Sequence, residues 1–139
     1  PEQWTFLSAN YGAVRINGHD ISGLSWSPDG KKLAFWVMEL FGANIEGNAG
    51  QATIHILDAE TKAIRSYCGY GTEEHTPNPP SLVWSPDSTH LAFAGNIPGD
   101  DKGYLLLAMD IETGNLTEFS DGVYPNYGAP NVIAWGRRP

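Results

Sequence analysis

The chain has 139 residues, of which 41% are hydrophobic and 17% charged, and its formal net charge is -8. This length suits one ordinary domain with a sizeable core, and the apolar content excludes a disordered chain. The excess of 16 acidic over 8 basic side chains disfavours nucleic acid and anionic membrane surfaces as partners. No apolar run reaches the roughly 18 residues needed for membrane insertion.

The turn-forming and aromatic content points to an all-β fold. The sequence contains 16 Gly and 10 Pro, together with 5 Trp, 6 Tyr and 5 Phe, and no segment shows a sustained helical period. Cys68 is the only cysteine, which excludes an internal disulfide and a metal site built from several cysteines. The chain begins at Pro1 without an initiator Met, which indicates a processed or excised segment.

Trp4–Ile16 is the first segment with a strand pattern. It predicts two strands joined by a turn at Asn10-Tyr11-Gly12, or strands at Trp4–Ser8 and Ala13–Ile16. These two strands look like the last two of a four-stranded unit that occurs twice further along the chain.

The repeated unit begins with the stretch Gly23–Phe35, GLSWSPDGKKLAF, which recurs as Ser81–Phe93, SLVWSPDSTHLAF. Proline presets the backbone of a tight turn, Asp favours the next position, and Gly30 supplies a positive φ. Apolar residues on both sides predict a hairpin whose second strand is buried. Ser88 replaces the glycine in the second copy, so this turn closes differently or tolerates strain. Ser27 and Ser85 are expected to hydrogen-bond the turn backbone.

Each copy continues with a second hairpin. Ala52–Tyr67 and Tyr104–Phe119 each contain Asp-x-Glu-Thr between two strand patterns. Gly114 supplies the turn in the second copy, and Lys62 stands at its place in the first. Asp58 and Asp110 are expected to cap these turns. Each unit therefore predicts four antiparallel strands, a to d, joined by two tight turns and one long loop, which is one blade of a β-propeller.

The last segment, Asn131–Pro139, resembles the first strand of a further blade. Trp135 stands there in the place of Trp26 and Trp84, and we expect all three indoles to pack between adjacent blades. The whole chain is thus predicted to be one propeller segment, with two complete blades and partial blades at both termini. Its parts are residues 1–20, a partial blade; 21–68 and 81–120, two blades; and 131–139, the first strand of another.

The residues Trp26–Phe35, followed later by Asp-x-Glu-Thr-Gly at Asp110–Gly114, resemble the repeat of TolB-like propellers, bacterial relatives of WD-repeat blades. Propellers of the prolyl oligopeptidase family carry similar repeats, with the core Trp-Ser-Pro-Asp formed here by Trp26, Pro28 and Asp29 and by Trp84, Pro86 and Asp87. The resemblance implies a propeller fold and a periplasmic or extracellular location. It says little about activity.

Catalytic and metal-binding patterns are missing from the sequence. No Gly-x-Ser-x-Gly elbow is present, and His19, His55, His75 and His90 have no metal-ligand spacing. The loop Gly99–Gly103 lacks the alternating oxygen ligands of a calcium site. We therefore expect no enzyme activity, no metal and no cofactor in this chain.

Propeller geometry places the a–b and c–d turns on one face and the long b–c and d–a connections on the other. The long connections contain the candidate binding residues: Phe41, Tyr70, Glu73, Glu74, His75, Tyr124 and Tyr127. Aromatic and acidic side chains on loops over a rigid scaffold are typical of a recognition surface. We refer to this surface as the loop face.

Three functions remain open from the sequence. The first is a non-catalytic scaffold that binds a protein or peptide through the loop face. The second is the substrate-gating propeller of a larger serine hydrolase, and the third is a module that binds carbohydrate or small molecules. Two blades do not close a ring, since propellers have roughly 4–8. We expect completion by another copy, as a dimer that closes a six-bladed ring, or by a longer propeller chain.

Overall fold

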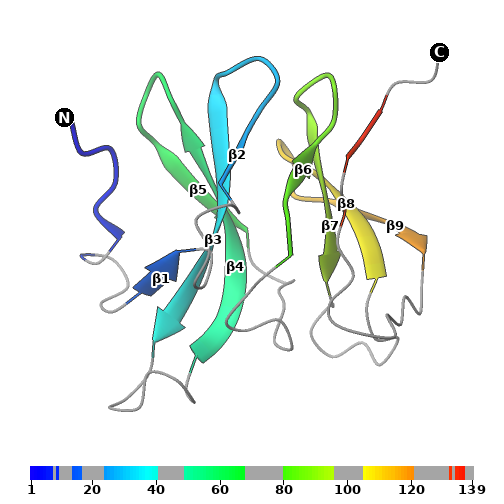
Figure 1. The fold of residues 1–139 in the computed structure, drawn as a ribbon, viewed down its shortest axis with the longest axis horizontal. Helices are drawn as coiled ribbons and strands as arrows, with labels where there is room; N and C mark the ends of the chain where they lie inside the picture. The colour runs from blue at the N-terminus through cyan, green and yellow to red at the C-terminus, as the bar shows by residue number, and fades with distance from the viewer. Residues whose placement is uncertain are drawn as a thin grey trace.

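The computed structural model describes residues 1–7, 9, 14–16, 24–40, 49–67, 80–95, 105–120, 132 and 134–136. These residues form two antiparallel β-sheets that lie side by side (Figure 1). The first sheet contains β1 (Val14–Ile16), β2 (Ser25–Trp26), β3 (Lys32–Leu40), β4 (Ala49–Asp58) and β5 (Ile64–Tyr67). The second contains β6 (Val83–Trp84), β7 (His90–Gly95), β8 (Leu105–Asp110) and β9 (Leu116–Ser120).

The two predicted blades are confirmed. Strands β2-β3-β4-β5 and β6-β7-β8-β9 pair antiparallel in chain order, as strands a to d of each unit. Their registers match across the repeat, because Lys32 lies opposite Asp58 as His90 lies opposite Asp110. The chain is therefore an all-β protein built from β-propeller blades. None of the described residues forms a helix with the length and hydropathy that a membrane crossing requires.

The assignment of Ala13–Ile16 to a preceding blade is wrong for the described part of this segment. Strand β1 pairs with the far half of β3, with Ile16 opposite Val37, while β2 pairs with the near half. The other edge of β3 is occupied by β4 along its length. Strands β1 and β2 therefore share one edge and together form the inner strand of the first blade.

The N-terminal segment also differs from the prediction of a strand at Trp4–Ser8. Trp4 to Phe6 form no strand, and Leu7 and Ala9 lie in a helical turn closed by a 3.0 Å hydrogen bond from the Ala9 amide to the Phe6 carbonyl. Leu7 is buried and belongs to a cluster on the outer side of the first sheet. Apolar packing of Leu7, with Trp4 at the border of the same cluster, holds the segment in place of strand pairing.

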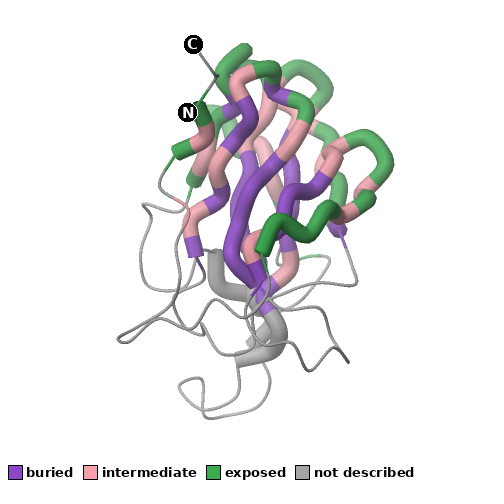
Figure 2. Tube along the Cα trace, turned by 90° about the vertical axis from the view of Figure 1, so that its right-hand side faces the viewer, coloured by how far each residue is buried: buried purple, intermediate pink, exposed green. Residues whose placement is uncertain are grey.

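The main core lies between the two sheets. Because side chains alternate along a strand, each sheet presents one row of residues to its neighbour and the other row outward. The first sheet contributes Ala34, Trp36, Ala52, Ile54, Ile56 and Tyr67 to the shared cluster. The second sheet, with Leu82 directly before β6, contributes Leu82, Trp84, Leu91, Phe93, Leu105, Leu107 and Met109. Figure 2 shows this burial along the strands and exposure at the turns.

Indole groups fix the two sheets to each other on the inner side. Trp36 Nε1 donates a 2.7 Å hydrogen bond to the Pro80 carbonyl, and Trp84 Nε1 donates a 2.9 Å bond to the Ser25 carbonyl. The Trp36 ring also meets Phe93 edge to face, with 5.7 Å between centroids. These contacts join apolar packing to directional bonds, which sets the relative position of the blades.

Candidate functional site

The a–b turn of the first blade is closed by its own side chains. Ser27 Oγ accepts a 2.9 Å hydrogen bond from the Lys32 amide and donates a 2.6 Å bond to Asp29. The Asp29 carboxylate also accepts from the Lys31 amide at 3.0 Å. The hydrogen bond from Ser27, followed by that from Lys31, lowers the pKa of Asp29. Gly30 adopts the left-handed conformation that the turn requires, at φ 72°.

The second a–b turn repeats this network. Ser85 Oγ accepts from the His90 amide at 2.9 Å and donates to Asp87 at 2.6 Å, and Thr89 Oγ1 lies 2.7 Å from the same carboxylate oxygen. These bonds, led by that from Ser85, lower the pKa of Asp87 to about 2. Ser88 takes the place of Gly30 and holds φ at 63°, so strain is tolerated here. The predicted role of both serines is confirmed.

Ser88 has a function that glycine could not supply. Its buried hydroxyl oxygen accepts a 3.2 Å hydrogen bond from the Asp29 amide, which joins the a–b turns of the two blades. The left-handed backbone of a non-glycine residue costs roughly 1–2 kcal/mol, and this bond between blades offsets part of that cost.

The c–d turns are capped by Asp58 and Asp110, as expected. Asp58 accepts from the Glu60 amide at 3.0 Å, from the Thr61 amide at 2.7 Å and from the Thr61 hydroxyl at 2.9 Å. The Thr61 bonds are the main cause of the lowered pKa of Asp58.

Asp110 makes the corresponding bonds at 2.8 to 3.0 Å. Its pKa is lowered mainly by the bonds from Thr113. The four repeat aspartates therefore stabilise turns, and their positions do not pair carboxylates for catalysis.

His90 forms a small cluster that the sequence did not single out. His90 Nδ1 lies 2.7 Å from Thr89 Oγ1, and Nε2 lies 3.8 Å from Asp110 Oδ2. A hydroxyl, an imidazole and a carboxylate in this order resemble a nucleophile with its base. The hydroxyl, however, also meets the Asp87 carboxylate, and the nearby amides of Thr89 and His90 already donate to Ser85. These two amides are therefore already engaged and are not preorganised to stabilise an oxyanion.

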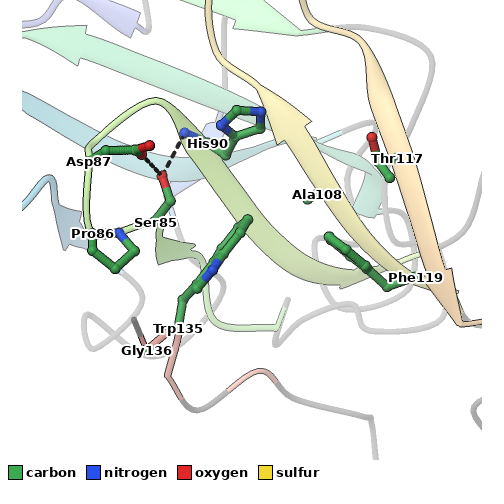
Figure 3. A pocket seen from close by; sticks show the side chains of 9 residues that line it. All are labelled: Ser85, Pro86, Asp87, His90, Ala108, Thr117, Phe119, Trp135 and Gly136. Atoms are coloured by element: carbon green, nitrogen blue, oxygen red, sulfur yellow. Dashed lines mark hydrogen bonds between the residues drawn. The ribbon is translucent and has the colours of Figure 1, made fainter. Parts of the chain in front are cut away.

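An open hollow lies beside this cluster, on the outer side of the second sheet (Figure 3). Its volume is about 510 Å³. Trp135 forms one wall, with its ring centroid 6.2 Å from those of both His90 and Phe119. Phe119 is 59% exposed. The sequence signal for this hollow was the Trp135 match to the repeat.

A second hollow, of about 450 Å³, lies between the inner strands of the two blades. Trp26, Pro28, Trp84 and Val132 are among the residues that line it. Two of the repeat tryptophans differ sharply in their exposure. Trp84 is 5% exposed and packs between blades as expected, whereas Trp26 is 50% exposed. Trp26 is thus half exposed within these two blades, and its packing between blades stays a prediction.

The candidate residues of the loop face lie outside the described part of the chain: Phe41, Tyr70, Glu73, Glu74, His75, Tyr124 and Tyr127. The same is true of Cys68, His19 and the loop Gly99–Gly103. Within the described residues, no group of three or more His, Cys, Asp or Glu side chains could hold a metal ion.

His55 is the one buried imidazole in the described segments. Its ring stacks on Phe35, with 5.9 Å between centroids, and Nδ1 lies 3.2 Å from the Thr53 carbonyl oxygen. Burial lowers the pKa of His55, which favours the neutral ring in the folded state. This histidine belongs to the apolar side of the first sheet.

Comparison with protein families and with curated proteins finds no match. Among solved structures, a protein described as a dipeptidyl aminopeptidase IV from Bacteroides ovatus aligns with a TM-score of 0.55 at 19% identity, over 84% of this chain and 20% of that chain. TolB from Acinetobacter baumannii aligns with a TM-score of 0.27 at 18% identity, over 76% of this chain and 33% of that chain. This chain spans about a fifth of the peptidase, and the likeness shows the β-propeller fold.

Proposed function

We propose that this chain is a non-catalytic propeller scaffold with TolB-type repeats that binds a protein or peptide through its loop face. The observation that carries this proposal is that short turns and long connections lie at opposite ends of the strands. On the turn face, the repeat carboxylates and serine hydroxyls of both blades are engaged in closing their own turns, which leaves short, rigid connections.

The opposite face receives every long connection of the two blades. Strand β3 ends at Leu40 and β4 begins at Ala49, and β7 ends at Gly95 before β8 begins at Leu105. Strand β5 ends at Tyr67, well before β6 begins at Val83. Long loops on a rigid scaffold are the usual carriers of recognition, and those of this chain include the aromatic and acidic candidates.

Two further parts of the proposal concern context. The scaffold is completed by another copy of the chain, as in a six-bladed dimer, or by a longer polypeptide, because two blades are fewer than the roughly 4–8 of a ring. It works in the periplasm or outside the cell, as the resemblance to TolB-like repeats implies.

A second candidate is the substrate-gating propeller of a larger serine hydrolase. The alignment with the dipeptidyl aminopeptidase IV favours it. In that case the nucleophile and its base belong to another domain, and the loop face of the propeller meets the substrate.

A peptide-display selection against the immobilised full chain tests the scaffold proposal. Selected peptides should lose at least tenfold in affinity for the Glu73→Ala/Glu74→Ala variant. The Glu60→Ala/Glu112→Ala variant is the matched control, because it removes the same charge from the exposed c–d turns. Loss of affinity in the control alone would place binding on the turn face and would contradict the proposal. Hydrolysis of the peptides by the chain would contradict a non-catalytic role.

A further inference from the structure

The repeat shows which face of the first blade corresponds to the buried face of the second. The second blade turns Leu91, Phe93 and Met109 toward the first sheet, where they are fully buried. Strand registers place Leu33, Phe35 and Leu57 at the same positions of the first blade, on the side away from the second sheet. By the repeat, this outer face is where another blade would sit.

The N-terminal segment covers that face. Leu7, which is 5% exposed, packs with the buried Phe35, Val37 and Leu57, and Trp4 borders the same cluster. We call residues Trp4–Leu7 the strap. A few residues of irregular chain thus bury apolar side chains that face a whole sheet in the second blade.

The strap reproduces one contact between the blades in detail. At the c–d turn of the second blade, a Cβ at Gly114 would lie 3.5 Å from the Tyr67 ring of the first blade. Lys62 holds the position of Gly114 in the first blade, and its Nζ lies 3.3 Å from the centroid of the Trp4 ring. Trp4 therefore stands where the repeat places the aromatic ring of another blade.

The opposite end of the molecule shows the same arrangement in a looser form. Trp135 lies against the outer side of the second sheet, beside Phe119. By sequence spacing Phe119 matches Tyr67, since each follows its strand's first residue by three positions, although the register of β9 shifts there. In the first sheet, Tyr67 belongs to the cluster that holds Trp84. Trp135 thus occupies the position that the repeat tryptophan of a further blade would take on this sheet, which we call the seat. The hollow beside it remains open.

We propose that the strap and Trp135 cover two sheet faces on which neighbouring blades would otherwise pack. They compete for these faces with a second copy of this chain. In the competing state, the first blade of one copy seats on the second sheet of another, head to tail, and Trp26 replaces Trp135. This inference rests on the assembly by copies included in the proposed function. The observation behind it is the environment of Trp26. Its counterpart Trp84 is buried between the blades and bonds Ser25, whereas Trp26 is half exposed.

A difference between the two sheets explains why Trp135 stays on the second sheet when no second copy is bound. On the first sheet, Arg65 and Tyr67 donate to the Ile111 carbonyl of the second blade at 3.2 and 2.5 Å. The counterpart of Arg65 on the second sheet is Thr117 by strand register, and that of Tyr67 is Phe119 by sequence spacing. The Ile111 carbonyl corresponds to that of Ala59, which accepts from Lys62 in the same turn. The second sheet therefore lacks this pair of hydrogen bonds between blades, which we call the clamp.

Sedimentation velocity on the full chain tests the competition. The Trp4→Ala/Leu7→Asp variant and the Trp135→Ala variant should each lower the dissociation constant for self-association at least tenfold. The Thr117→Arg/Phe119→Tyr variant, which installs the clamp without touching the strap, should do the same. Glu118→Arg is the control, because it lies on the other side of β9 and changes the charge more, and it should have no effect.

The direction of the Trp135 effect separates this proposal from adhesion of an apolar patch. Removal of an indole weakens an adhesive patch, whereas here it opens the seat. Far-UV circular dichroism identifies variants that have lost their fold, and the clamp variant then decides the question. Unchanged self-association in the folded clamp variant would overturn the proposal, as would equal association of the Glu118→Arg control. Peptide binding by the loop face is measured separately, so its failure is distinguishable from failure of the competition.

Discussion

Substitution of Trp84 and Trp26 by alanine compares one repeat position in two environments. A buried tryptophan removes roughly 150–250 Å² from water, and at about 25 cal/mol per Å² this contributes ~4–6 kcal/mol. Trp84→Ala should therefore lower the free energy of unfolding by about 3–5 kcal/mol. Loss of the indole bond to Ser25 belongs to the same cost. Trp26 is half exposed, so Trp26→Ala should cost about 2 kcal/mol or less.

Urea unfolding followed by far-UV circular dichroism measures both variants without depending on tryptophan emission. A difference of ~2 kcal/mol corresponds to roughly 6–10 °C in Tm for a domain of this size. Trp84→Phe adds a test of the hydrogen bond, with an expected cost of about 1–2 kcal/mol for the indole N–H and the lost area. Equal costs for Trp84→Ala and Trp26→Ala would refute the reasoning, because the two positions would then be equally buried.

Further predictions concern turn strain and pH. Ser88→Gly should be about 1 kcal/mol more stable than Ser88→Ala in urea titrations, since both lose the bond from Asp29 but only alanine keeps the strained φ; the reverse order would contradict the strain. Because the pKa of His55 is lowered on folding, the unfolded chain binds the proton first. Stability should therefore fall as pH drops below 6.5 and stay level above it. His55→Leu, which copies Leu107 at the same repeat position, should abolish this slope between pH 5 and 7, and persistence of the slope would assign it elsewhere. A separate loss of stability should follow below pH 3.8, toward the pKa of about 2 of Asp87, and Asp87→Asn should reduce it in acid titrations followed by circular dichroism.

The blades could be predicted from the sequence because their signals are local and occur twice. Pro28 and Gly30 fix a turn by backbone geometry, and the apolar strands beside it have a single pairing that buries them. Asp58 and Asp110 could be placed at caps because a carboxylate three residues before Thr has the turn amides within reach.

The terminal segments could not be predicted in the same way. Val14–Ile16 carries a strand pattern, but nothing local specifies whether it pairs with β3 or with a blade outside the segment. Leu7 is fixed by contacts with Phe35 and Leu57, which are distant in sequence. Exposure of Trp26 has the same origin, since burial of a repeat position depends on a neighbouring sheet that its own sequence does not encode.

The placement of the main core between the sheets, instead of within either one, has a consequence for hydrogen exchange. Amides of β3 and β4 and those of β7 and β8 depend on the same cluster of side chains, so opening of one sheet uncovers the other. Their slowest-exchanging amides should therefore share one opening free energy and lose protection together as denaturant rises. Amides of β9, whose side chains are mostly exposed, should exchange earlier and independently.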